Sequence, residues 1–189
     1  MNFFKRPFVA VLLTVLIVVC STLVSINVKL ESKCGAVSDI FYEGVRISGV
    51  EYPAMAEPMK QLCALTDDII LIANNYGIDT GELSQRLDAL ELAMQYSADD
   101  VNHIGSCYGE YFKALRSVEN QLQSTGLSER HQAAMDEYSA QIASCSETIA
   151  QGAAGYNEKV RSFLKSYDKF PTGFWADVTG AVLPGYFNA

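Results

Sequence analysis

Basic side chains are scarce in this sequence. Of its 189 residues, 14 are Lys or Arg and 22 are Asp or Glu, which gives a formal net charge of −8. A protein that binds the phosphate backbone of nucleic acid needs a basic surface that releases counterions, so we expect no nucleic-acid partner. Proline is also scarce, with 5 residues, while 49% of the chain is apolar. These counts argue against a disordered or collagen-like chain.

The common catalytic motifs are missing as well. There is no Gly-rich phosphate loop, no G-x-S-x-G, no H-E-x-x-H and no C-x-x-C. Histidine occurs only at His103 and His131. Asp100 precedes His103 by three residues, as in a di-metal helical bundle, but Ser128 stands where the second acid would be. In one helical hairpin the two histidines would differ in height by about 27 Å.

We therefore expect no catalytic residue, no metal site and no cofactor, and a protein that is not an enzyme. Ten tyrosines, several at helical spacing, are interpreted as bundle-core residues whose hydroxyls reach the rim. The alternative hypothesis is a metal-dependent or enzymatic helical bundle with its centre between the helices.

Acidic residues are absent before Glu31, and residues 8–28 carry no charge. A helix of that length is about 30 Å long, the thickness of the hydrocarbon core of a bilayer. Residues 1–7 form a short basic N-terminus with Lys5 and Arg6. The sequence therefore predicts a transmembrane helix over 8–28 that places the chain in a lipid bilayer.

Two other readings of the apolar run remain open. A cleaved signal peptide also begins basic and then turns apolar, and its removal would release a secreted bundle. Its apolar core is usually shorter, however, and no A-x-A-like site follows here. A lipoprotein would use Cys20, but the bulky Val19 precedes it. Two basic residues flank each end of the run, so apart from Glu31 the charges do not decide the orientation.

Apolar and aromatic residues recur every three or four positions from Leu83 to Leu122. This period predicts a helix of about forty residues, because strand alternation has a period of two. Asp79 and Glu82 have the spacing of a capping box at its start. Only Ser97 interrupts the series, whose members are Leu83, Leu87, Leu90, Met94, Val101, Ile104, Tyr108, Tyr111, Leu115, Val118 and Leu122.

The same period predicts further helices on both sides. One runs from about Ser128 to Tyr167, and Phe170-Pro171 ends it. Another spans 55–76, and the apolar stretch 36–45 is expected to be helical before a break at Ser48-Gly49. The expected fold is all-α: an N-terminal transmembrane helix followed by an elongated antiparallel bundle of long helices over 29–170, with coiled-coil-like seams.

The last residues, 171–189, differ in composition. They mix aromatic residues with glycine and proline, which excludes a long helix. Their aromatic side chains are nevertheless too apolar to remain exposed to water. We expect this aromatic tail to pack on the bundle; contact with a partner or a membrane surface is the alternative.

Two cysteines lie at equal distances from a predicted turn. The midpoint of Cys107 and Cys145 is Gly126, where the chain reverses between two long helices. Antiparallel helices that leave this turn bring both cysteines to the same height. Their spacing therefore favours a Cys107–Cys145 disulfide, one pairing among the three connectivities that four cysteines allow.

A second pair has the same relationship to the other expected break. The midpoint of Cys34 and Cys63 falls between Ser48 and Gly49, which favours a Cys34–Cys63 disulfide. The alternative is that these cysteines are free thiols that pack as small apolar residues. Because disulfides persist outside the reducing cytosol, bonded cysteines would place the bundle on the extracytoplasmic side.

The C-terminal residues resemble the LemA family of bacterial membrane proteins. The resemblance covers about the last sixty residues and lies in Tyr156, Asn157 and Val160, then Phe170-Pro171, and the closing Tyr186-Phe187. It implies one N-terminal membrane helix followed by a bundle of long helices. An Arg usual before the Tyr-Asn pair is replaced here by Gly152-Ala153-Ala154, and the family's Arg-rich first helix pair has no clear counterpart. The family implies no catalytic residue.

The sequence thus predicts a single-pass, membrane-anchored, LemA-like bundle that acts as a non-enzymatic scaffold or interaction module of the bacterial cell envelope. Residues 29–189 carry 12 basic and 22 acidic side chains, a net charge of −10. We expect protein partners in the envelope, basic ones in particular, with an association that weakens as salt rises.

Overall fold

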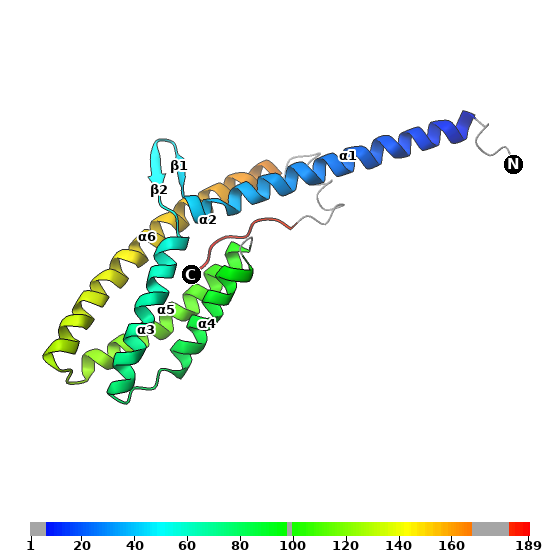
Figure 1. Cartoon of the computed structure of the whole chain (residues 1–189). Helices are drawn as coiled ribbons and strands as arrows, with labels where there is room; N and C mark the ends of the chain where they lie inside the picture. The colour runs from blue at the N-terminus through cyan, green and yellow to red at the C-terminus, as the bar shows by residue number, and fades with distance from the viewer. Residues whose placement is uncertain (1–6, 98–99, 168–181) are drawn as a thin grey trace. The chain divides into compact units, whose positions relative to one another are not determined.

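A computed structural model describes residues 7–97, 100–167 and 182–189 of the chain. These residues fall into two compact units. One combines the N-terminal residues up to Ala36 with Ser162–Leu183, and the other combines Val37–Arg161 with Pro184–Ala189. Figure 1 follows the chain through its helices and one short hairpin. The all-α class predicted from the sequence is confirmed.

Helix α1 (Pro7–Ser38) contains the uncharged run. An 18-residue window of it has a mean hydropathy of 2.8, and none of that window is buried within the protein. Val11, Ile17 and Val24 are examples of its large apolar side chains that are more than half exposed. It is the one described helix that is long and apolar enough to cross a membrane.

The first unit has its own small apolar cluster just past that run. Leu30 on α1 packs with Tyr167, and Cys34, Phe163 and Leu183 lie against them. The rings of Phe163 and Tyr167 stack with their centroids 6.2 Å apart. Leu30 and Cys34 are four residues apart, so they lie on one face of α1.

A β-hairpin occupies the region where the sequence predicted a helix and a break. The one-turn helix α2 (Ile40–Glu43) precedes strands β1 (Val45–Ile47) and β2 (Val50–Tyr52), which pair antiparallel. Ser48 and Gly49 form its two-residue turn with φ of 50° and 87°. Such hairpin turns need positive φ at both central residues. The expected helix over 36–45 is therefore wrong beyond Glu43.

Helix α3 (Ala56–Asn75) follows its expected bounds closely. Its apolar face is buried, and a hydroxyl pair joins it to α5 (Val101–Ser124). The Tyr111 hydroxyl lies 2.5 Å from that of Thr66 and donates to the Leu62 carbonyl at 3.2 Å. This pairing satisfies polar groups that would otherwise destabilise the core.

The single helix expected from Leu83 to Leu122 is in fact two. Helix α4 (Gly81–Tyr96) ends before Ser97, and α5 begins at Val101. Asp100 caps α5 by accepting a hydrogen bond from the His103 amide at 3.0 Å. The chain reverses here, so that Arg86 on α4 reaches Glu110 on α5.

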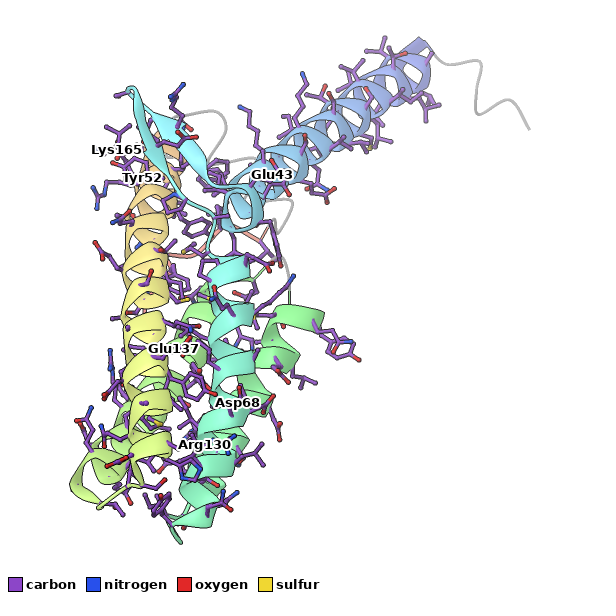
Figure 2. All side chains as sticks on the ribbon, turned by 60° about the vertical axis from the view of Figure 1, so that its left-hand side comes forward. Glu43, Tyr52, Asp68, Arg130, Glu137 and Lys165 are labelled. Carbon is purple, nitrogen blue, oxygen red and sulfur yellow. The ribbon has the colours of Figure 1, made fainter. Side chains whose placement is uncertain are left out.

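Helix α6 (Glu129–Tyr167) has the predicted length and returns alongside α5. Gly152 and Gly155 lie on its buried face. A Cβ built on Gly152 would lie 2.6 Å from the carbonyl oxygen of Pro53, and one on Gly155 would overlap the Tyr52 side chain. Tyr52 lies on the hairpin beside α6 in Figure 2. These glycines let the hairpin approach the helix backbone.

Candidate binding groove on helices α5 and α6

A groove of about 540 Å³ lies between α5 and α6 in the second unit. Among the described residues its lining is mostly apolar or small, and Lys113 is the one charged side chain there. The described C-terminal residues form one of its walls. The lining comprises Tyr108, Gly109, Phe112, Lys113, Ser146, Ile149, Ala150, Ala153, Ala154, Asn157, Phe187 and Ala189.

Two glycines of α5 let the C-terminal residues lie against the helix. A Cβ on Gly105 would be 3.0 Å from the Phe187 ring and from the Asn188 nitrogen. A Cβ on Gly109 would be 3.0 Å from the carbonyl carbon of Ala189. Glycine inside a helix costs about 1 kcal/mol relative to alanine. Here each glycine makes room for a backbone.

Asn157 of α6 forms two hydrogen bonds with the backbone of one residue. Its Nδ2 donates to the Phe187 carbonyl at 3.0 Å, and the Phe187 amide donates to its Oδ1 at 2.8 Å. Residues paired across an antiparallel sheet exchange the same two bonds. The amide side chain of Asn157 therefore acts as a single rung of a strand partner.

Tyr156 and the Phe187 ring complete the contact. The Tyr156 hydroxyl donates to the Gly185 carbonyl at 3.1 Å. Phe187 is 4% exposed, with its ring centroid 6.1 Å from that of Tyr108. Burial raises the pKa of both Tyr108 and Tyr156 to about 12, so both hydroxyls are neutral at physiological pH.

Beyond Phe187 the groove continues along α5. Phe112 stacks on Tyr108 with centroids 5.6 Å apart, and the Arg116 guanidinium lies 4.9 Å from the centre of the Phe112 ring. Lys113 is exposed at the groove's edge. This end of the groove thus combines an aromatic floor with one cationic side chain of its lining, Lys113, in a chain that is acidic as a whole.

No family model, no curated protein and no solved structure matches this chain. The geometry described above is therefore the basis for any functional proposal.

The residues that carry the LemA resemblance have distinct places. Tyr156, Asn157 and Phe187 meet in the contact just described. Val160 is fully buried in the core, and Tyr186 is half-buried. Phe170 and Pro171 lie outside the described residues.

The expected Cys107–Cys145 disulfide is not formed, because both cysteines are free. Cys107 lies 3.9 Å from His103 Nε2, and its pKa is raised by burial and by Glu110, with Arg86 opposing. Its thiol therefore lies on the side of α5 that faces α4. Cys145 instead lies near Tyr108, whose pKa it helps to raise. Consecutive helical residues point about 100° apart, so equal height did not bring the two thiols together.

The expected Cys34–Cys63 disulfide is not formed either. The midpoint argument assumed a tight turn between two helices, but the β-hairpin intervenes at Ser48-Gly49. Cys34 packs in the Leu30 cluster of the first unit. Cys63 is buried in the second unit, where burial and the carboxylates of Glu91 and Asp67 raise its pKa to about 12.

The two histidines make contacts in separate parts of the bundle. The His103 backbone amide receives the Asp100 cap, so the Asp-x-x-His spacing is a helix start. His131 Nδ1 lies 2.9 Å from the Tyr76 hydroxyl, which also accepts a hydrogen bond from the Ser128 amide. Within residues 7–97, 100–167 and 182–189, no three His, Cys, Asp or Glu side chains gather as a metal site would require.

The sequence interpretation missed the groove. Gly105 and Gly109, four residues apart inside a helix, were a signal of close backbone approach. The paired hydrogen bonds of Asn157 left no such local signal, because their partner lies 30 residues away in the chain.

Proposed function

We propose that this protein is a membrane-anchored, LemA-like helical bundle that binds other proteins of the cell envelope and carries out no catalysis. The observation that carries the proposal is α1, whose apolar run is exposed along its whole hydrophobic window. Burying such a surface in a bilayer removes a large apolar area from water. The groove on α5 and α6 is the surface we assign to binding.

The LemA assignment is supported by how its motif residues are used. Tyr156 and Asn157 hold the segment that ends in the aromatic pair Tyr186-Phe187. The departure at Gly152 also has a local reason, because the carbonyl oxygen of Pro53 lies where a side chain at this position of α6 would begin.

We further propose that the bundle lies on the extracytoplasmic side. The free cysteines no longer support this orientation. The flanking charges do not decide it, because Lys5 and Arg6 on one side of the run equal Lys29 and Lys33 on the other, so the proposal depends on a direct test. A reporter fused after Ala189 tests it: alkaline phosphatase should be active and green fluorescent protein dark. The reverse result would place the bundle in the cytoplasm.

Retention of α1 is tested on membranes from intact cells. An anchored protein stays in the pellet after carbonate extraction and keeps its N-terminal residues, as sequencing of the mature chain would show. A signal sequence near the N-terminus would meet the same length and hydropathy criteria as α1. If the mature protein is soluble and its sequence begins after the apolar run, the apolar run is a cleaved signal and the protein is a secreted bundle.

Partner binding is tested with a photo-crosslinking residue at Lys113, which lines the groove. A matched variant carries it at Glu137, also exposed but outside the groove lining. We expect protein crosslinks from position 113 and few from position 137. In isolated membranes the yield should fall at high salt, as the net charge of residues 29–189 implies. Equal yields from both positions would count against the groove.

A further inference from the structure

The described C-terminal segment Pro184–Ala189 has no regular secondary structure. What holds it is a set of contacts with α5 and α6: the two Asn157 bonds, the Tyr156 bond, and the buried Phe187 ring. The position of this segment thus depends on side chains of α5 and α6 and not on secondary structure of its own. In this respect it resembles a peptide ligand bound to a receptor.

The groove contacts the backbone of the C-terminal segment more than its side chains. Asn157 and Tyr156 contact only carbonyl and amide groups of the segment, and Gly105 and Gly109 admit its main chain. The Phe187 ring is its one large buried side chain. Recognition of this kind requires an extended peptide with one aromatic anchor and tolerates changes elsewhere, as in strand-addition binding.

The segment and the groove belong to one chain, and this covalent connection determines how fully the segment occupies the groove. Three hydrogen bonds and one ring give a modest affinity for a free peptide. A tethered segment has an effective concentration of about 1 mM or more, which keeps a weak site filled. A competing peptide must overcome this occupancy, so the segment acts as a latch on the groove.

We infer that Pro184–Ala189 is an intramolecular ligand that occupies one side of the α5–α6 groove. When it is withdrawn, an extended peptide with one aromatic anchor residue takes its place on α5 and α6 in trans. Past the aromatic anchor, such a peptide would meet the Phe112 ring and the cationic side chain of Lys113. The inference rests on the proposed binding role of this groove and adds its regulation.

The test uses the full chain in detergent and a fluorescein-labelled heptapeptide with the sequence of residues 183–189. Fluorescence anisotropy measures binding to the wild type, Phe187→Ala and Asn157→Ala. The first substitution empties the anchor position and leaves the α5 and α6 sides of the groove unchanged, while the second releases the segment and removes the backbone clamp. We expect Phe187→Ala to bind at least tenfold more tightly than the wild type. Asn157→Ala should bind no more tightly than the wild type.

Two controls make the result decisive. A peptide with Asp in place of its Phe should not bind any variant. Hydrogen exchange of the backbone amide at position 187 should accelerate in both variants, which reports release of the segment independently of binding. If Phe187→Ala loses helical circular dichroism, Phe187→Leu takes its place, because a smaller apolar side chain weakens the anchor and should still tighten peptide binding relative to the wild type, by less than Phe187→Ala would.

The latch is overturned if the helical Phe187→Ala variant, with its segment released, binds the peptide no better than the wild type. It is also overturned if Asn157→Ala gains binding equally, because the gain would then not depend on the clamp. Neither result bears on whether envelope proteins crosslink at position 113 in cells, so failure of the latch and failure of the proposed function are distinguishable.

Discussion

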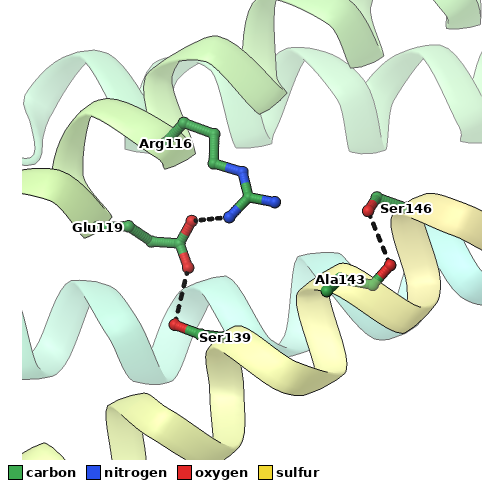
Figure 3. A network of polar contacts seen from close by, with 5 residues as sticks. All are labelled: Arg116, Glu119, Ser139, Ala143 and Ser146. Atoms are coloured by element: carbon green, nitrogen blue, oxygen red, sulfur yellow. Dashed lines mark hydrogen bonds and ion pairs between the residues drawn. The ribbon is translucent and has the colours of Figure 1, made fainter.

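Glu119 on α5 is 2% exposed, and its carboxylate accepts a hydrogen bond from Arg116, one turn before it, at 2.8 Å. Its other oxygen accepts from Ser139 on α6 at 3.2 Å, as Figure 3 shows. The Arg116 side chain is 44% exposed. A buried carboxylate is thus neutralised from the solvent side and tied to the neighbouring helix, which satisfies both of its oxygens.

This arrangement predicts unequal effects of removing the two charges. Arg116→Ala leaves a buried carboxylate without its counter-charge, and we expect it to lower the free energy of unfolding by about 2 kcal/mol. Glu119→Gln keeps an acceptor for Ser139 and should cost about 1 kcal/mol or less. In urea denaturation the double variant should be more stable than Arg116→Ala alone. Additive losses would contradict the pairing.

Two glycine substitutions should have opposite signs. Gly155→Ala places a Cβ into the Tyr52 side chain and should cost about 1–3 kcal/mol despite the better helix propensity of alanine. Gly35→Ala on α1 meets nothing within 4 Å and should be neutral or stabilising. Thermal unfolding measures both, and Tyr52→Ala should relieve the cost of Gly155→Ala. A Gly155→Ala variant as stable as wild type would contradict the close approach of the hairpin.

Stability should fall steeply at alkaline pH. Burial raises the pKa of Tyr108 and Tyr156 from 10.0 to about 12, so between these values the unfolded chain loses protons that the folded one keeps. Their contribution is fully present below pH 10 and is lost towards pH 12, at about 1.4 kcal/mol per pH unit for each ring. Urea unfolding at stepped pH measures the slope, which Tyr108→Phe should reduce. An unchanged slope in that variant would contradict the burial of its hydroxyl.

Cysteine reactivity should follow burial. Cys63 is 4% exposed with a pKa raised to about 12, whereas Cys107 is half-buried with a smaller rise. Because the thiolate is the reactive form, iodoacetamide at pH 8 should modify Cys107 before Cys63. Mass spectrometry of tryptic peptides gives both rates, which should converge in denaturant. A Cys107–Cys145 crosslinked peptide without reductant would contradict the free thiols of the structure.

The local spacing of apolar residues was sufficient to predict which segments are helical and which of their faces are buried. The period of three and four residues placed Tyr111, Leu115 and Leu122 in the core, and all three are fully buried. It also gave α3 and α6 within a residue or two of their ends. This works because the face that a helical residue presents depends only on its position along the helix.

The same period concealed the turn between α4 and α5. The spacing of apolar residues stays in phase through Ser97, so two antiparallel helices and one long helix give the same pattern. The Asp100 cap distinguishes them, but the Asp100–His103 spacing was compared only with a di-metal site, which the sequence does not complete, and not with a helix start. Height along a helix likewise suggested the disulfides, whereas only the direction of each side chain decides whether two thiols meet.

The sequence by itself determined which faces of the chain avoid water, because burial of periodic apolar residues follows from the local backbone. Only the tertiary structure decided where the chain reverses and which distant groups meet there. Asn157 and Phe187 illustrate this: their two hydrogen bonds depend on the return of the last residues to α6 and on the space that Gly105 and Gly109 leave on α5.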